Sequence, residues 1–84
     1  MPISRVRIQF VQELTTRTGR PRFDVYATKP FTKRGNQCLS TLDMFKASLC
    51  QKAGKRGRAV DLGWRETKWG PEIVTVELVK DNAA

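Results

Sequence analysis

The chain has 84 residues, which suits one domain with a single hydrophobic core. It carries 16 Lys and Arg against 8 Asp and Glu, a formal net charge of +8, and it has no histidine. This balance favours a nucleic acid, an anionic surface or an acidic protein as partner. The lack of histidine excludes His-based catalytic triads and histidine metal sites, and the acids are scattered. We therefore expect a non-enzymatic protein without a cofactor or a metal.

The excess positive charge is concentrated in two segments. Residues 15–36 hold six cations and one acid, and residues 44–60 hold five cations and no acid. Residues 61–84 hold three cations and five acids. We expect folding to bring the two basic segments onto one face.

Cys38 and Cys50 are the only cysteines, too few for a disulfide scaffold and without metal-ligand spacing. We expect both to be reduced thiols in the cytoplasm. No apolar stretch reaches the length of a signal sequence core or a membrane span, so no membrane partner is expected.

The first expected elements form a β-hairpin. Residues 5–11 alternate, with Val6, Ile8 and Phe10 on the apolar face, and this strand is expected to continue through Leu14. Residues 15–21 are rich in turn formers, and residues 23–27 alternate again. These features predict an antiparallel hairpin with a basic tip.

A loop over residues 29–37 is followed by the one expected helix. Ser40 and Asp43 predict its start, because a hydroxyl and a carboxylate both suit a helix N-terminus. Gly54 predicts its end. Its apolar stripe, expected to face the core, consists of Leu42, Phe45, Leu49 and Ala53.

Two further strands complete the expected fold. Residues 59–66 place Val60, Leu62 and Trp64 on one face, and residues 72–80 alternate most clearly. The fold class is α+β, a single domain over residues 1–80 in the order ββαββ. We expect a mostly antiparallel four-stranded sheet with the helix on one face and the other face open or used in a homodimer. Residues 81–84 are expected to form a frayed tail.

Two basic turns resemble parts of known nucleic-acid-binding families. Gly54-Lys55-Arg56-Gly57 resembles the G-x-x-G loop of KH domains, in which glycines admit a phosphate backbone that cations neutralise. The strand-like run after Arg58 departs from that family, whose loop joins two helices. Gly19-Arg20-Pro21-Arg22 resembles the core of an AT-hook, although Thr18 replaces the usual preceding arginine. Each resemblance covers four residues and implies phosphate or groove contacts only.

Trp69 is the candidate for stacking on an unpaired base, because it lies in a turn between Lys68 and Gly70. Trp64 is assigned to the core by its alternation with Val60 and Leu62. Phe31, between Lys29 and Lys33, has a weaker claim to a surface role.

These patterns predict a small basic protein that binds DNA or RNA through a helix-end loop and a hairpin tip. The expected contact residues are Lys52, Lys55, Arg56, Arg58, Arg17, Arg20, Arg22, Lys33, Arg34 and Trp69. An alternative is a small regulator or inhibitor that binds an acidic surface of a larger protein machine. A third reading is a ribonuclease that relies on arginines and Tyr26, the only tyrosine.

Overall fold

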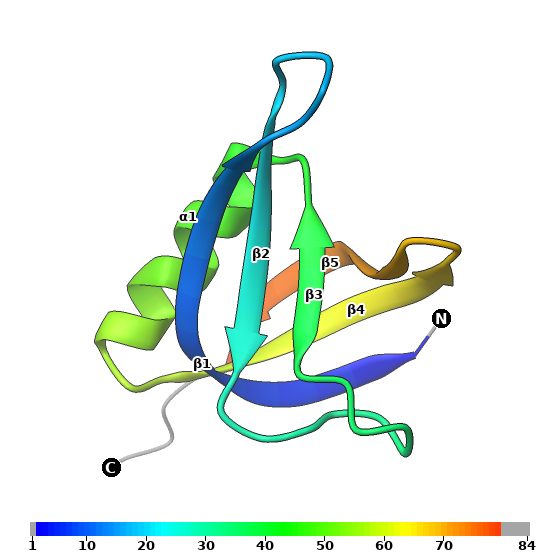
Figure 1. The fold of residues 1–84 in the computed structure, drawn as a ribbon. Helices are drawn as coiled ribbons and strands as arrows, with labels where there is room; N and C mark the ends of the chain where they lie inside the picture. Colours follow the sequence, from blue (N-terminus) through cyan, green and yellow to red (C-terminus); the bar gives the residue numbers. More distant parts are fainter. Residues whose placement is uncertain (1, 80–84) are drawn as a thin grey trace, which may run out of the picture.

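The computed structural model describes residues 2–79 as a small single α+β domain with five strands and one helix (Figure 1). The elements in chain order are β1 (Ile3–Thr15), β2 (Pro21–Ala27), β3 (Cys38–Thr41), α1 (Met44–Lys55), β4 (Ala59–Thr67) and β5 (Gly70–Leu78). Within this range no helix is long and apolar enough to cross a membrane. The tail expected at residues 81–84 lies outside the described residues.

The five strands form a closed barrel in the order β1-β2-β3-β5-β4, with β4 pairing back onto β1. Every pairing is antiparallel except that of β3 with β5, which are parallel around Ser40 and Glu72. The expected four-stranded ββαββ sheet is therefore wrong in detail. The residues of β3 were expected to lie in a loop and at the start of the helix. The sheet was expected to have an open face, and it closes into a barrel instead.

β1 is long and curved, and it pairs with β4 through its first half and with β2 through its second half. The register with β2 shifts between Ile8 and Phe10, where a β-bulge changes which face each side chain takes. Val6 and Ile8 are buried as expected, whereas Phe10 is 47% exposed. The expectation that Phe10 lies in the core is therefore wrong, because the bulge turns it outward.

The core fills the barrel with aliphatic side chains from all five strands and from α1. Its best buried members are Val25, Leu39, Val60, Leu62 and Cys50. Trp64 packs against this core as expected, and its indole N–H donates to the Ser4 hydroxyl at 3.0 Å. Phe31 also packs against the core, edge-on to Trp64 with ring centroids 5.4 Å apart, which removes its claim to a surface role.

α1 begins at Asp43, whose carboxylate accepts hydrogen bonds from the backbone N–H groups of Phe45 and Lys46. Ser40, the other expected start, belongs to β3. The helix buries Ala47, Cys50 and Ala53 against the barrel.

The expected apolar stripe of α1 is wrong for Leu42 and Phe45, which are exposed. Small residues face the barrel because the helix lies close to β1. A Cβ placed on Gly54 would stand 3.2 Å from the backbone oxygen of Ile8. This spacing leaves no room for large side chains between the two elements, so they lie on the outer side of the helix.

Candidate functional site

A groove runs along the outer side of β3, between β2 and the β4–β5 turn. Two adjoining hollows of about 280 and 270 Å³ form it, and they share Arg22, Ser40 and Trp69. Its other lining residues are Thr16, Asn36, Gln37, Cys38, Thr41, Leu42, Thr67, Pro71 and Glu72. We call this surface the β3 groove.

The alternation of β2 and β3 decides which side chains reach the groove. Phe23, Val25 and Ala27 point into the barrel, and Leu39 does so from β3. The intervening residues of each strand therefore take the outer face, among them Arg22 on β2 and Ser40 on β3.

Arg22 is held in place by its neighbour on the same face. Its Nε donates to Oδ1 of Asp24 at 3.1 Å, and the Asp24 side chain is only 11% exposed. A guanidinium has five N–H donors, so this bond leaves other donors of Arg22 for a ligand. Asp24 thus orients the cation and offsets part of its charge.

Trp69 presents its indole at the opposite side of the groove, 76% exposed. Its backbone N–H donates to the Thr67 hydroxyl at 3.1 Å, and that hydroxyl donates to the Gly70 carbonyl at 2.7 Å. Gly70 adopts a φ of 105°, which a side chain would disfavour. The Lys68 ammonium lies 5.2 Å from the ring centroid of Trp69. The expected exposure of Trp69 is confirmed.

Loops rich in cations lie at the two ends of the groove. Thr16, at the base of the β1–β2 loop, lines one end, and this loop carries Arg17 and Arg20 beyond the barrel (Figure 1). The β2–β3 loop contributes Asn36 and Gln37 to the other end and carries two more exposed cations, Lys33 and Arg34. Six of the ten predicted contact residues therefore line the β3 groove or lie on loops that border it.

An aromatic pair continues this face onto β1. Phe10 and Tyr26 stack with ring centroids 4.4 Å apart and an interplanar angle of 19°. Tyr26 pairs in register with Cys38, which lines the groove. Sequence reasoning missed this aromatic pair on the outer face because it placed Phe10 inside. The sequence did contain a signal for this. In the run Val6-x-Ile8-x-x-Val11, the alternation of apolar residues slips by one position after Ile8.

The Cys38 thiol and the Tyr26 hydroxyl of this face stay protonated at neutral pH. Burial raises the pKa of the Cys38 thiol above its ordinary value of 9.0, and the neighbouring Cys38 raises the pKa of Tyr26 above 10.0. A protonated thiol is a poor nucleophile. Within residues 2–79, no three His, Cys, Asp or Glu residues are grouped so that they could hold a metal ion.

Glu72 is the exposed acid of the groove, and it is paired. Arg65 donates to its Oε1 at 3.1 Å from the neighbouring strand. Because Glu72 is matched by Arg65 and Asp24 by Arg22, neither carboxylate stands as an uncompensated charge against an anionic ligand.

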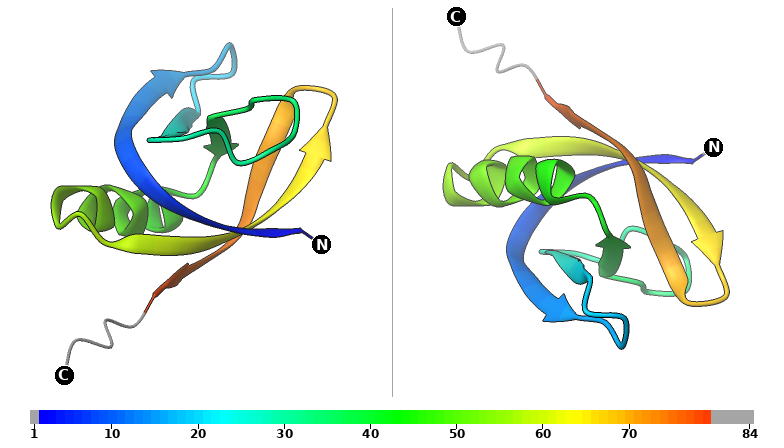
Figure 2. Two further views of the ribbon diagram at one scale, coloured as in Figure 1. Left: turned by 90° about the horizontal axis from the view of Figure 1, so that it is seen from below. Right: turned by 90° about the horizontal axis from the view of Figure 1, so that it is seen from above.

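The four remaining predicted contact residues lie elsewhere. Lys52, Lys55, Arg56 and Arg58 gather around the C-terminal end of α1, which Figures 1 and 2 place away from the β1–β2 loop. Arg58 also has a local role, since its Nη2 donates to the Val79 carbonyl at 2.9 Å. The structure does not bring the two basic segments onto one face as expected.

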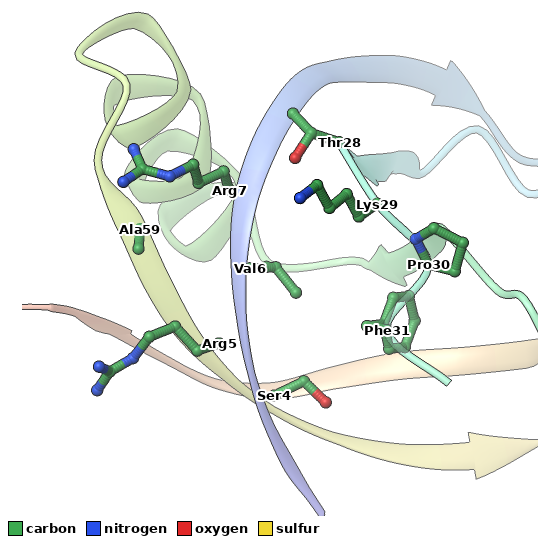
Figure 3. A pocket seen from close by; sticks show the side chains of 9 residues that line it. All are labelled: Ser4, Arg5, Val6, Arg7, Thr28, Lys29, Pro30, Phe31 and Ala59. Carbon is green, nitrogen blue, oxygen red and sulfur yellow. The ribbon is translucent and has the colours of Figure 1, made fainter. Parts of the chain in front are cut away.

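A second pocket, of about 550 Å³, lies between β1 and the segment after β2 (Figure 3). Its arginines are already engaged. Arg5 donates to Asp61 at 2.9 Å, a bond that lowers the pKa of Asp61, and Arg7 donates to the Gly57 carbonyl. Figure 3 shows both arginines extending away from Phe31, across β1. Lys29 also lines this pocket and forms no salt bridge among residues 2–79. The aromatic side chain of the pocket, Phe31, packs against the core, so the pocket lacks the exposed aromatic surface that Trp69 gives the β3 groove.

Comparison with known proteins gives no relative: no family model, no curated protein and no solved structure matches the chain.

Proposed function

We propose that this protein binds an unpaired stretch of nucleic acid along the β3 groove and catalyses no reaction. The observation that carries the proposal is the exposed indole of Trp69, which lines the same groove as Arg22, with cationic loops at both ends of that groove. The following steps give the chemistry that each part would supply.

Trp69 supplies a stacking surface for a base. Base–aromatic stacking contributes about 1–3 kcal/mol per base and tolerates any sequence, because every base has a π face. The Thr67 and Gly70 hydrogen bonds fix the backbone of the turn, so little backbone entropy is lost when the indole meets a base. The stacked rings of Phe10 and Tyr26 offer a further apolar surface on the same side of the barrel. A duplex keeps its bases stacked inside, so this surface suits a single strand.

The cations supply phosphate contacts. Arg22 lies in the groove, and Arg17, Arg20, Lys33 and Arg34 lie on the loops at its ends. A single nucleic-acid strand lying along the groove would pass from one loop to the other. Its successive phosphates would then lie next to the cations of the two loops and Arg22. In this proposal the helix-end cations lie outside the contact path.

The architecture adds support by analogy. The chain resembles OB-folds, five-stranded barrels that bind oligonucleotides on the face of strands 2 and 3 and with the loops β1–β2 and β4–β5. The β3 groove lies at the corresponding place. An analogy of fold supports the position of a site and leaves its ligand to experiment.

The test is a fluorescence anisotropy titration with labelled single-stranded DNA and RNA of about 12 nucleotides, alongside the matching duplexes. We expect tighter binding to single strands. Trp69→Ala should weaken that binding by about 5- to 150-fold, the loss of one stacked base. Phe45→Ala is the matched control, because Phe45 is an aromatic residue of similar exposure on α1.

The proposal fails if single strands do not bind at about 50 mM salt, where phosphate contacts are strong. It also fails if Phe45→Ala weakens binding as much as Trp69→Ala, because the loss would then not arise in the groove.

A further inference from the structure

Two large apolar side chains are exposed in the first turn of α1, and a third is exposed just before the helix. Met44 and Phe45 are 66% and 73% exposed, and Leu42, which precedes the Asp43 cap, is 61% exposed. Single exposed apolar residues are ordinary, whereas a contiguous group marks a surface that another molecule covers. The group lies at the N-terminal end of the helix.

The same helix becomes basic toward its C-terminal end. Phe45, Leu49, Lys52 and Arg56 follow one another at helical spacing, so they share one side of α1, and Lys55 lies beside them. Among the described residues, Lys52, Lys55 and Arg56 form no salt bridge. The face therefore has an apolar half and a half of unpaired positive charge.

The packing of α1 explains why these side chains are outside. Ala47, Cys50 and Ala53 make the contact with the barrel, and Gly54 allows the close approach to Ile8. The barrel closes without the large apolar residues of the helix. Their exposure costs solubility.

We propose that this α1 face docks a segment of a partner protein that carries apolar side chains followed by carboxylates. Met44 and Phe45 are suited to apolar side chains rather than to a phosphate backbone, which argues for a protein partner. Lys52, Lys55 and Arg56 then complement carboxylates through charge. From Phe45 to Arg56 the helix rises about 16 Å, the span of about five extended residues.

The charge pattern also sets the direction of the segment. Asp43, paired with Lys46 at 3.8 Å, is the acid at the apolar end, and it disfavours a second carboxylate there. The cations lie at the other end. The partner's apolar residues therefore lie over the start of α1 and its carboxylates over the end.

The part of this face from Phe45 to Arg56 lies outside the β3 groove, whereas Leu42, which precedes the helix, lines the groove. Figure 2 shows α1 on one side of the barrel, with the β1–β2 loop and the β4–β5 turn on the other. The docking proposal does not depend on the proposed function.

The test selects phage-displayed random peptides for binding to the whole protein. The peptides have about 12 residues, which is long enough to cover the face. We expect the enriched peptides to combine apolar residues with a run of Asp or Glu. Affinities of the enriched peptides, made synthetically, are then measured by isothermal titration calorimetry. Lys52→Glu with Lys55→Glu, and separately Phe45→Ser, should each weaken binding by about tenfold or more.

The matched control is Arg17→Glu with Arg20→Glu, which changes the charge equally on the β1–β2 loop and should leave peptide binding within about twofold. Circular dichroism shows whether each variant is folded, and Lys52→Ala with Lys55→Ala replaces the Glu pair if that pair unfolds the protein. The proposal is overturned if enrichment yields no acidic and apolar peptide. It is also overturned if the control loses as much affinity, or if oligonucleotide rather than peptide shifts the NMR signals of α1.

Discussion

Cys38 and Cys50 show how the fold gives two identical side chains different chemistry. Cys50 is fully buried between α1 and the barrel, and burial raises the pKa of its thiol to about 11. Cys38 is partly exposed on the outer side of β3, where burial also raises the pKa of its thiol. A raised pKa means that the reactive thiolate is scarce at neutral pH and grows as pH rises toward the pKa.

We expect iodoacetamide to label Cys38 before Cys50, at a rate that increases with pH above neutrality. Cys50 should react only when the protein unfolds, because neither solvent nor reagent reaches it. Because Cys38 lines the β3 groove, a bound oligonucleotide should slow its labelling and leave the rate at Cys50 unchanged. Mass spectrometry of the labelled peptides measures both rates. Equal rates for Cys38 with and without saturating oligonucleotide would contradict the groove assignment.

At the scale of elements, α1 depends on its N-terminal cap. It has 12 residues, and its first turn contains no acid. A helix of this length is marginal alone and is stabilised by its cap and by packing on the barrel. Asp43 supplies the cap through Oδ1, which accepts from Phe45 N–H at 2.9 Å and from Lys46 N–H at 3.4 Å.

We expect Asp43→Ala to lower the free energy of unfolding by about 0.5–2 kcal/mol, the usual cost of removing a helix cap. Asp43→Ser should retain most of the stability because its hydroxyl can accept the same hydrogen bond. Urea denaturation followed by circular dichroism measures the differences. A Ser variant as unstable as the Ala variant would show that the cap is not the source of the loss.

At the scale of the whole molecule, the separation of the two basic regions decides what each can contact. The described chain extends over 47 × 26 × 19 Å, and the β1–β2 loop and the end of α1 lie in different parts of it. A ligand confined to the β3 groove meets the loop cations and not those of the helix.

This separation predicts different salt dependences for two double variants. Each phosphate contact on a single strand adds about −0.7 to the slope of log affinity against log salt. Arg17→Ala with Arg20→Ala should therefore flatten the slope by about 1.4. Lys52→Ala with Lys55→Ala removes the same charge from α1 and should leave the slope nearly unchanged. Titrations at several salt concentrations compare them, and equal changes in both variants would place the strand across both regions.

Alternation and turn chemistry in the sequence were enough to predict four of the five strands, the basic hairpin and the position of the helix. They worked there because each pattern is local, repeats over several residues and ends at a Gly, Pro or Asp. The exposure of Trp69 was predicted for the same reason, since it lies in a short turn beside Gly70.

Tertiary structure alone decided the closure of the barrel, the place of β3 and the side of α1 that is buried. β3 has four residues, too few for a period to be recognised, and its partners lie far away in the sequence. Phe10 turned outward at a bulge that pairing with β2 creates, and Phe45 turned outward because only small residues fit beside β1. The sequence by itself thus determined the charge of the protein and most of its elements. Which cations share a surface was set by non-local strand pairing, because that pairing decides where each loop lies.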